Sequence, residues 1–135
     1  MTTDLPDNLQ RFLAHANPSV MATTAKDGHP VTAATWYFFE SDGRILINLD
    51  AERVRLQHLR RDTRFALDVL DGSDWYTHVA LQLDIVEITE DVDLLDIDTL
   101  SMHYTGAPYS NRTNPRVSVR GEISKWMGWN ADAVE

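Results

Sequence analysis

The chain contains no cysteine in its 135 residues. This absence excludes disulfides, iron–sulfur clusters, cysteine zinc sites and thiol nucleophiles. Long apolar runs are also missing, since none approaches the roughly 18 residues of a membrane span. The first eight residues are polar and acidic and do not resemble a secretory signal peptide. We therefore expect a cytoplasmic protein with no membrane partner.

Basic residues are scarce, with 12 Lys and Arg against 21 Asp and Glu, a formal net charge of −9. This balance argues against non-specific binding to DNA, RNA or anionic lipid. Aromatic side chains on a strand would suit nucleic-acid stacking, but the charge opposes that reading. The length and the 43% hydrophobic content are typical of one globular domain, which we place over residues 1–135.

Alternating apolar and polar positions dominate the chain and predict β-strands. Turn residues at Gly28 and Gly43 join the first three strands into an expected antiparallel meander. Three short helices are expected over residues 6–16, 52–61 and 91–104. Their apolar side chains are expected to face inward, namely Leu9, Phe12 and Leu13 in the first, Leu56 and Leu59 in the second, and Leu94, Leu95, Ile97 and Leu100 in the third. The predicted fold is mainly β, a small split barrel of six antiparallel strands, which cover residues 19–25, 30–40, 44–50, 65–70, 75–89 and 115–124.

A cluster of arginines interrupts the acidic sequence. Residues 53–64 hold five of the twelve basic side chains, namely Arg53, Arg55, Arg60, Arg61 and Arg64. The planar guanidinium binds two oxygens of a phosphate or carboxylate at once. The first two open a predicted helix, where backbone N–H groups also face an anion. The other three are expected to complement the helix dipole or to face solvent.

Large aromatic residues follow one another on the second predicted strand. Phe38 and Phe39 are expected to pack in the core, while Trp36 and Tyr37 could wall a flat ligand or a subunit interface. The five histidines show no metal-binding spacing, so no metal site is expected. No nucleophile motif or glycine-rich phosphate loop occurs. An enzyme of this sequence would depend on a cofactor for its reactive chemistry.

Several motifs, in order, resemble one known family. Gly28-His29-Pro30-Val31 followed by Ala34-Thr35-Trp36-Tyr37 is similar to the G-x-P…W-Y/F hairpin of the pyridoxamine-phosphate-oxidase-like split β-barrels. The segment from Arg53 to Arg64 resembles their R-x-K-x-x-N-L-R-R-D-P-R motif. Asp74-Trp75-Tyr76, Tyr104-Thr105-Gly106 and Arg116-Val117-Ser118-Val119 match further blocks. The resemblance covers nearly the whole chain.

Within this family the chain resembles most the short members that use the deazaflavin coenzyme F420 rather than FMN. The resemblance implies an oxidoreductase that transfers a hydride between the deazaflavin and a small unsaturated organic substrate. It also implies a homodimer with each cofactor between the subunits. The implied cofactor-binding residues are Ala34, Thr35, Trp36, Asn48, Leu49, Asp50, Arg53, Arg55 and, from the partner subunit, Trp75. By this resemblance Arg53 and Arg55 would bind the phosphate, and Asn48, Leu49 and Asp50 would line the ring or tail through backbone groups.

Three departures from the family pattern stand out. Arg55 stands where lysine is usual, His58 replaces asparagine, and Leu83-Asp84 stands where many members have Gly-Arg. Asp50 adds a negative charge beside the expected anion site. One alternative is therefore an FMN-dependent flavoprotein of the pyridoxamine-phosphate oxidase type.

A second alternative is a non-catalytic protein that binds F420 or haem. Haem would require an axial histidine, with His58, His78 or His103 as candidates. The sequence assigns no physiological substrate and no catalytic residue. Tyr37, Tyr104 and His58 are candidates for a general acid by residue type alone.

Overall fold

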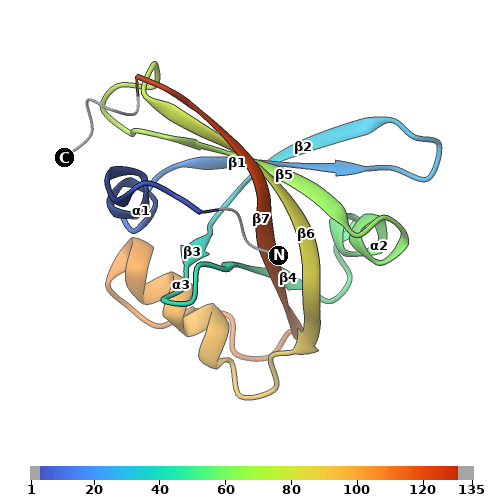
Figure 1. Ribbon diagram of the computed structural model, residues 1–135. Coiled ribbons are helices and arrows are strands. Elements are labelled where there is room, and N and C mark those ends of the chain that lie inside the picture. Colours follow the sequence, from blue (N-terminus) through green and yellow to red (C-terminus); the bar gives the residue numbers. More distant parts are fainter. Residues whose placement is uncertain (1–3, 131–135) are drawn as a thin grey trace.

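The structure is a computed structural model that describes residues 4–130 (Figure 1). Three short helices accompany a sheet formed by most of the remaining chain. The helices are α1 (Asp7–Leu13), α2 (Val54–Arg61) and α3 (Leu95–Thr105). The strands are β1 (Ser19–Thr24), β2 (Pro30–Thr35), β3 (Phe38–Phe39), β4 (Ile45–Asp50), β5 (Arg64–Leu70), β6 (His78–Glu90) and β7 (Arg116–Trp129).

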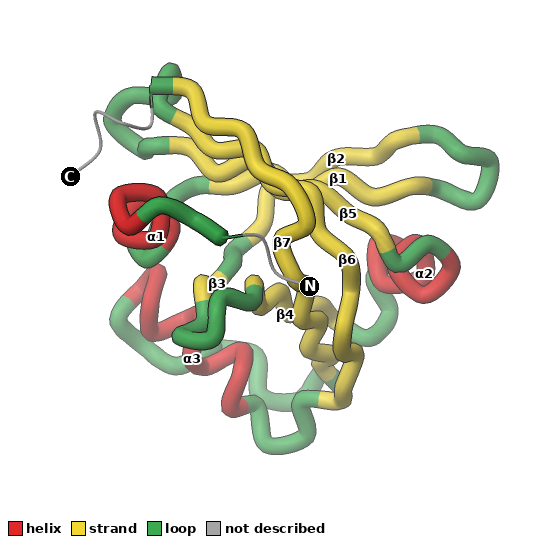
Figure 2. Tube along the Cα trace, in the orientation of Figure 1, coloured by secondary structure: helices red, strands yellow, loops and turns green. Residues whose placement is uncertain are grey.

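All seven strands belong to one antiparallel sheet in the order β2-β1-β5-β6-β7-β4-β3 (Figure 2). The expectation of a mainly β, antiparallel fold with short helices is confirmed. The expectation of a six-stranded barrel is corrected. Seven strands are present, and within residues 4–130 the end strands β2 and β3 do not pair with each other, so the sheet is open.

The seventh strand arises because the predicted strand over residues 30–40 divides in two. β2 pairs with β1 as far as Thr35, and pairing with β4 starts at Phe38. Between them Tyr37 turns into the core, where its hydroxyl donates to the carbonyl of Leu13 at 2.7 Å. The predicted meander is therefore wrong. Its two hairpins lie at opposite ends of the sheet.

The helices bury the faces that the sequence predicted. Leu9, Phe12 and Leu13 of α1 are buried, as are Leu56 and Leu59 of α2. Both helices therefore contribute an apolar face to the main core, together with one face of the sheet.

The third helix begins at Leu95, four residues later than predicted, because the carboxylate of Asp91 caps it. Asp91 accepts hydrogen bonds from the backbone N–H groups of Asp96 at 3.1 Å and Ile97 at 2.9 Å. The late start leaves Leu95 exposed, although the pattern predicted it to face inward. Ile97 and Leu100 are buried and form a second, smaller core with Leu46.

The two longest strands also have different limits from those predicted. β6 begins at His78 rather than residue 75, because Asp71 and Thr77 close a turn before it. β7 continues to Trp129 instead of ending at residue 124. Their pairing contains register shifts at Gln82/Leu83 and Ile85/Glu87. Such bulges bend long strands, which lets β6 and β7 serve both halves of the sheet. No helix of the described chain is long and apolar enough to cross a membrane.

Candidate functional site

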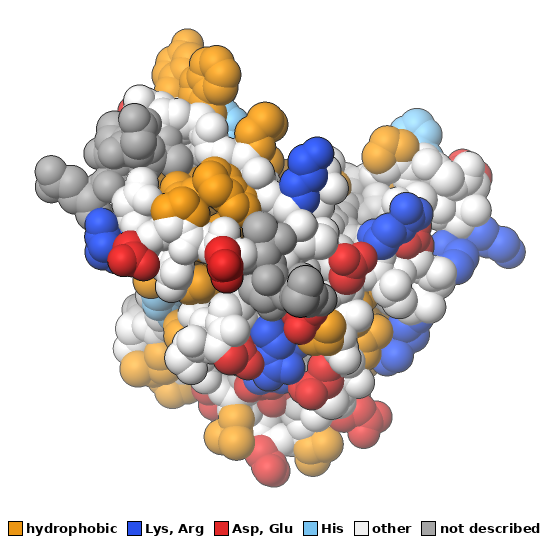
Figure 3. All heavy atoms as spheres, viewed as in Figure 1, with side chains coloured by type: hydrophobic (Ala, Val, Ile, Leu, Met, Phe, Trp, Pro, Cys, Tyr) orange, Lys and Arg blue, Asp and Glu red, His pale blue; other side chains and the backbone are white. Residues whose placement is uncertain are grey.

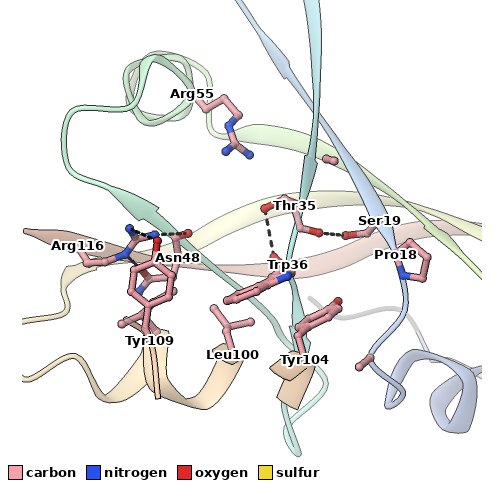
Figure 4. A pocket seen from close by; sticks show the side chains of 13 residues that line it. Pro18, Ser19, Thr35, Trp36, Asn48, Arg55, Leu100, Tyr104, Tyr109 and Arg116 are labelled. Atoms are coloured by element: carbon pink, nitrogen blue, oxygen red, sulfur yellow. Dashed lines mark hydrogen bonds between the residues drawn. The ribbon is translucent and has the colours of Figure 1, made fainter. Parts of the chain in front are cut away.

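A cleft of about 600 Å³ opens where β2 ends, facing β4, α2 and α3 (Figure 4). Five of the nine predicted cofactor-binding residues line it, namely Ala34, Thr35, Trp36, Asn48 and Arg55. The sequence analysis did not assign its other lining residues to the site, namely Ala16, Pro18, Ser19, Ile97, Leu100, Tyr104, Tyr109 and Arg116. The division of the predicted second strand creates this cleft, since the chain leaves β1 at Thr35.

Three aromatic rings form a wall of the cleft. The ring of Trp36 stacks on that of Tyr104, with centroids 5.3 Å apart and planes 6° apart. The ring of Tyr109 meets Trp36 edge-on at 6.2 Å. These residues come from the β2–β3 connection, from α3 and from the loop after α3, so the wall exists only in the folded chain. A flat aromatic surface of this kind suits a planar ligand.

Arg55 supplies a positive charge from the first turn of α2. Its side chain is half-buried, and its Nη1 lies 3.9 Å from the sulfur of Met21. Among the described residues, no carboxylate lies within ion-pair distance of it. Burial, and then the charge of Arg53, lower the pKa of Arg55, yet a guanidinium stays protonated at neutral pH. A partly desolvated cation without a counter-ion favours an anionic ligand.

Arg116 is a second cation in the cleft, and the sequence analysis did not assign it a role. Its Nε donates to Oδ1 of Asn48 at 2.8 Å, and its guanidinium lies 4.8 Å from the centre of the Tyr109 ring. Arg116 is the first residue of the last motif that resembles the family, and basic residues are scarce in this chain. That was the available signal, but Asn48, which orients Arg116, lies 68 residues away in sequence.

Asn48 holds Arg116 rather than offering its side chain to a ligand. Its Nδ2 donates to Asp91 Oδ2 at 3.0 Å and to Ser118 Oγ at 3.1 Å, and its Oδ1 accepts from Arg116. Its backbone groups, by contrast, lie on a part of β4 that lacks a strand neighbour on one side within residues 4–130. β3 pairs only with the first two residues of β4, so in the described chain no strand pairs with residues 47–50 of β4 on that side.

The other four predicted site residues do not line this cleft. Leu49 is buried in the core. Asp50 accepts hydrogen bonds from the backbone N–H of Glu52 and from Asn114, and the bond from Glu52 is the main cause of the lowered pKa of Asp50. Arg53 is exposed just before α2. Trp75 is 70% exposed in the loop before β6, stacked on Tyr76.

The remaining arginines of the cluster differ from Arg55. Arg60, Arg61 and Arg64 are exposed at or beyond the end of α2, as predicted. Arg64 forms a salt bridge with Asp62 at 3.0 Å, which lowers the pKa of that carboxyl. Its charge therefore has a counter-ion within the chain, and it has no role in the cleft.

None of the three candidate haem ligands lines the cleft. His58 is buried, with Nδ1 2.9 Å from the hydroxyl of Thr23. His78 lies beside the carbonyl of Tyr76, and His103 packs edge-on against Phe38. No group of three metal-ligating side chains occurs in residues 4–130.

Of the candidate general acids, Tyr104 alone lies in the cleft. Its hydroxyl donates to the carbonyl of Asn17 at 2.7 Å, and burial raises the pKa of Tyr104 to about 12. Tyr37 is fully buried, and burial raises its pKa further. Tyr104 therefore acts here as a wall of the cleft, with its proton already engaged by the backbone.

The fold and the cleft define a small, mainly β protein with a cationic and aromatic ligand groove. The sequence profile of pyridoxamine 5′-phosphate oxidase matches residues 5–130. The chain belongs to this family, which includes oxidoreductases and binds flavin-type cofactors. Comparison with curated protein sequences gives no match.

Solved structures share the fold. An F420 reductase superimposes with a TM-score of 0.81 at 17% identity, covering 91% of this chain and 98% of its own. A conserved hypothetical protein of Mycobacterium tuberculosis gives 0.72 at 26% identity, covering 96% and 87%. A candidate pyridoxamine 5′-phosphate oxidase of Lactobacillus delbrueckii gives 0.64 at 15% identity, covering 91% and 93%. At such low identity, the first and third likenesses concern the fold alone.

Proposed function

We propose that the chain is an F420-dependent oxidoreductase that binds the deazaflavin in this cleft and acts on a small unsaturated organic substrate. The observation that carries the proposal is the uncompensated guanidinium of Arg55, which lies in the same cleft as the wall of Trp36, Tyr104 and Tyr109. A planar redox cofactor with an anionic side chain needs these two features together. When bound, the deazaflavin supplies hydride transfer.

The residues present fit such a cofactor. Arg55 would hold its phosphate, and the backbone of residues 47–50 of β4, which lacks a strand neighbour on one side, would hydrogen-bond its ring. Ala34, Thr35 and Trp36 would lie along the ring. The chain's own contribution is to bind, orient and shield the cofactor from water.

One observation on this chain favours F420 over FMN. Two exposed arginines, Arg60 and Arg61, end the helix α2 that begins beside Arg55, and Figure 3 shows Lys and Arg side chains on the side of the molecule where α2 lies. A basic rim suits the acidic polyglutamate tail of F420, which FMN lacks.

We also propose that the protein is a homodimer that completes the cofactor site. Trp75 does not reach the cleft of its own subunit, and it is 70% exposed. In the proposed dimer, this side chain covers the cofactor bound to the partner. A large exposed aromatic residue of this kind is typical of an interface.

Titration of the purified protein with F420, and separately with FMN, tests the proposed function through ligand fluorescence. We expect selective binding of F420. Replacement Arg55→Ala should weaken binding by about 1.5–3 kcal/mol, the scale of a charged hydrogen bond. Arg64→Ala is the matched control, since Arg64 already pairs with Asp62, and its affinity should equal that of the wild type.

The outcomes separate the alternatives. Selective FMN binding would replace the proposal by an FMN-dependent flavoprotein. Tight F420 binding without turnover of enones or quinones would indicate a binding protein. Unchanged affinity in Arg55→Ala would remove the anion-site assignment, and binding of neither cofactor would refute the proposed function.

A further inference from the structure

The cleft contains a cation that the proposed cofactor site leaves unused. Arg116 projects from the start of β7, while Arg55 projects from α2, and Figure 4 shows the two side chains entering the cleft from different elements. Among the described residues, neither guanidinium has a carboxylate within ion-pair distance. One anionic group at Arg55 therefore leaves Arg116 without an ion-pair partner, although the charge of Asp50 acts on it from a longer distance.

The guanidinium of Arg116 is held in one orientation by the protein. Asn48 Oδ1 accepts from its Nε at 2.8 Å, and the ring of Tyr109 lies beneath it at 4.8 Å. Asn48 is fixed in turn by Asp91 at 3.0 Å and by Ser118 at 3.1 Å. A side chain that is already ordered loses less conformational entropy when it binds a ligand.

Two acidic residues lie near this group, and both are engaged elsewhere. Asp50 faces Arg116 across the β4–β7 pairing, but its carboxylate accepts from the N–H of Glu52 at 3.0 Å and from Asn114 at 3.1 Å. Asp91 accepts from Asn48 and from the first N–H groups of α3. Neither carboxylate forms an ion pair with Arg116.

The guanidinium retains donors for a ligand. Only its Nε makes a short hydrogen bond, because the contacts of Nη2 with the Asn48 carbonyl and of Nη1 with the Tyr109 hydroxyl are both 3.4 Å long. Two terminal N–H groups of one guanidinium match the two oxygens of a carboxylate. The side chains of Leu100 and Ile97, which also line the cleft, provide an apolar surface beside this cation.

We propose that Arg116 anchors the carboxylate of the substrate, so that the substrate class is planar, unsaturated organic acids. The assignment of Arg55 to the cofactor, and therefore of Arg116 to the substrate, rests on the proposed function. Asn48 is a positioning residue, because it acts on the ligand through Arg116. The binding of the carboxylate itself follows from the geometry around Arg116.

Isothermal titration of the full chain with trans-cinnamate and with cinnamamide, each with and without F420, tests this proposal. The two probes differ in charge and scarcely in shape. We expect cinnamate to bind about tenfold or more tightly than the amide, the scale of a charge-assisted hydrogen bond. Arg116→Gln should abolish this preference and leave the affinity for F420 unchanged.

Arg64→Gln is the matched control, because Arg64 is exposed, already pairs with Asp62 at 3.0 Å and does not line the cleft. It should retain the preference for cinnamate. Thermal unfolding checks that each variant is folded, and the comparison of the two probes on the wild type does not depend on any variant. Arg55→Ala should weaken F420 binding and keep the cinnamate preference.

Four results would overturn the assignment of Arg116. Two concern the wild type, namely no binding of cinnamate in either condition and equal binding of acid and amide. The other two concern a folded Arg116→Gln variant, namely one that keeps the cinnamate preference and one that loses F420 affinity as Arg55→Ala does. If the wild type binds no F420 but still prefers cinnamate to the amide, only the proposed function is refuted. The two failures are therefore distinguishable.

Discussion

At the scale of single residues, identical side chains have different roles because of their partners. Arg64 and Arg55 both belong to the arginine cluster that the sequence displays. Arg64 forms a salt bridge with Asp62 two residues away, whereas Arg55 lies half-buried against Met21 without an acidic partner in the described chain. The function of a guanidinium therefore follows from which carboxylates the fold brings within reach.

Asp68 on β5 is a carboxylate without compensation. Its Oδ1 is buried and has no hydrogen-bond partner in the described structure. Burial raises the pKa of Asp68 above its ordinary 3.8, with the charge of His78 acting in the opposite direction. The folded state therefore binds the proton more tightly than the unfolded chain. As the pH rises from about 3.8, the value of the unfolded chain, through the raised pKa of the folded state, this group lowers the free energy of unfolding.

Replacement Asp68→Asn should therefore raise the free energy of unfolding at pH 7. Near pH 3 both states of the wild type hold the proton, and the variant and the wild type should be nearly equal. Urea unfolding at the two pH values measures the difference. A variant that is less stable than the wild type at pH 7 would show that the carboxylate has a stabilising partner.

At the scale of elements, one aspartate connects α3 to the cleft. Asp91 caps the helix through the N–H groups of Asp96 and Ile97 and also holds Asn48. Replacement Asp91→Ala should lower the free energy of unfolding by about 1–2 kcal/mol, the range for a lost helix cap. Thermal unfolding checks this, with Asp93→Ala as control, since Asp93 is exposed in the same turn. Equal stabilities of the two variants would contradict the capping role.

The close packing of β7 against the Phe65 ring of β5 depends on a glycine. A Cβ at Gly121 would lie 2.9 Å from two ring atoms of Phe65 and 3.3 Å from the Cβ of Leu83. Replacement Gly121→Ala should therefore destabilise the fold by about 1–3 kcal/mol, as overpacked cores do.

Two further variants test the cause of this effect. Phe65→Leu in the Gly121→Ala background should recover part of the loss, because it removes the ring. Gly72→Ala should change stability little, since its Cβ would meet only Pro18 at 3.5 Å. If Gly121→Ala unfolds at the wild-type urea concentration, the close packing is not a constraint.

At the scale of the whole molecule, one end of the sheet exposes a group of large apolar side chains. Trp75 and Tyr76 precede β6, and Met127 and Trp129 end β7, with exposures of 62% to 70%. Trp129 pairs with His78 at the start of β6, which places the two segments together. Figure 3 shows hydrophobic side chains at the tip of the β5–β6 connection. Apolar groups gathered in this way are typical of interaction surfaces.

We expect sedimentation equilibrium to give a mass of about twice 15.4 kDa, as the proposed homodimer requires. Trp75→Ser should shift the protein toward the monomer and weaken F420 binding. Val92→Ser is the control, because Val92 is even more exposed, at 78%, but lies in the β6–α3 connection. If the wild type is a monomer, and if it binds F420 no more tightly than Trp75→Ser does, the dimer and its part in the site are refuted.

Prediction from the sequence succeeded where the structure depends on near neighbours. The apolar spacing of α1 and α2 identified their buried faces, because helix periodicity is local. Alternation identified most of the strands, and tight turns identified the two hairpins. Asn48 lines the cleft. Its amide group is engaged with Arg116, Asp91 and Ser118, and these contacts span 43 to 70 residues of sequence, so local patterns could not predict them.

The sequence by itself determined the local elements, the cluster of arginines and the membership of the family. The tertiary structure alone decided that the second predicted strand divides at Trp36 and Tyr37, and that Arg55 and Arg116 share one cleft while Arg64 does not. The physical reason is that periodicity and turn chemistry act between adjacent residues. Strand pairing, burial and charge compensation depend instead on segments that meet only after folding.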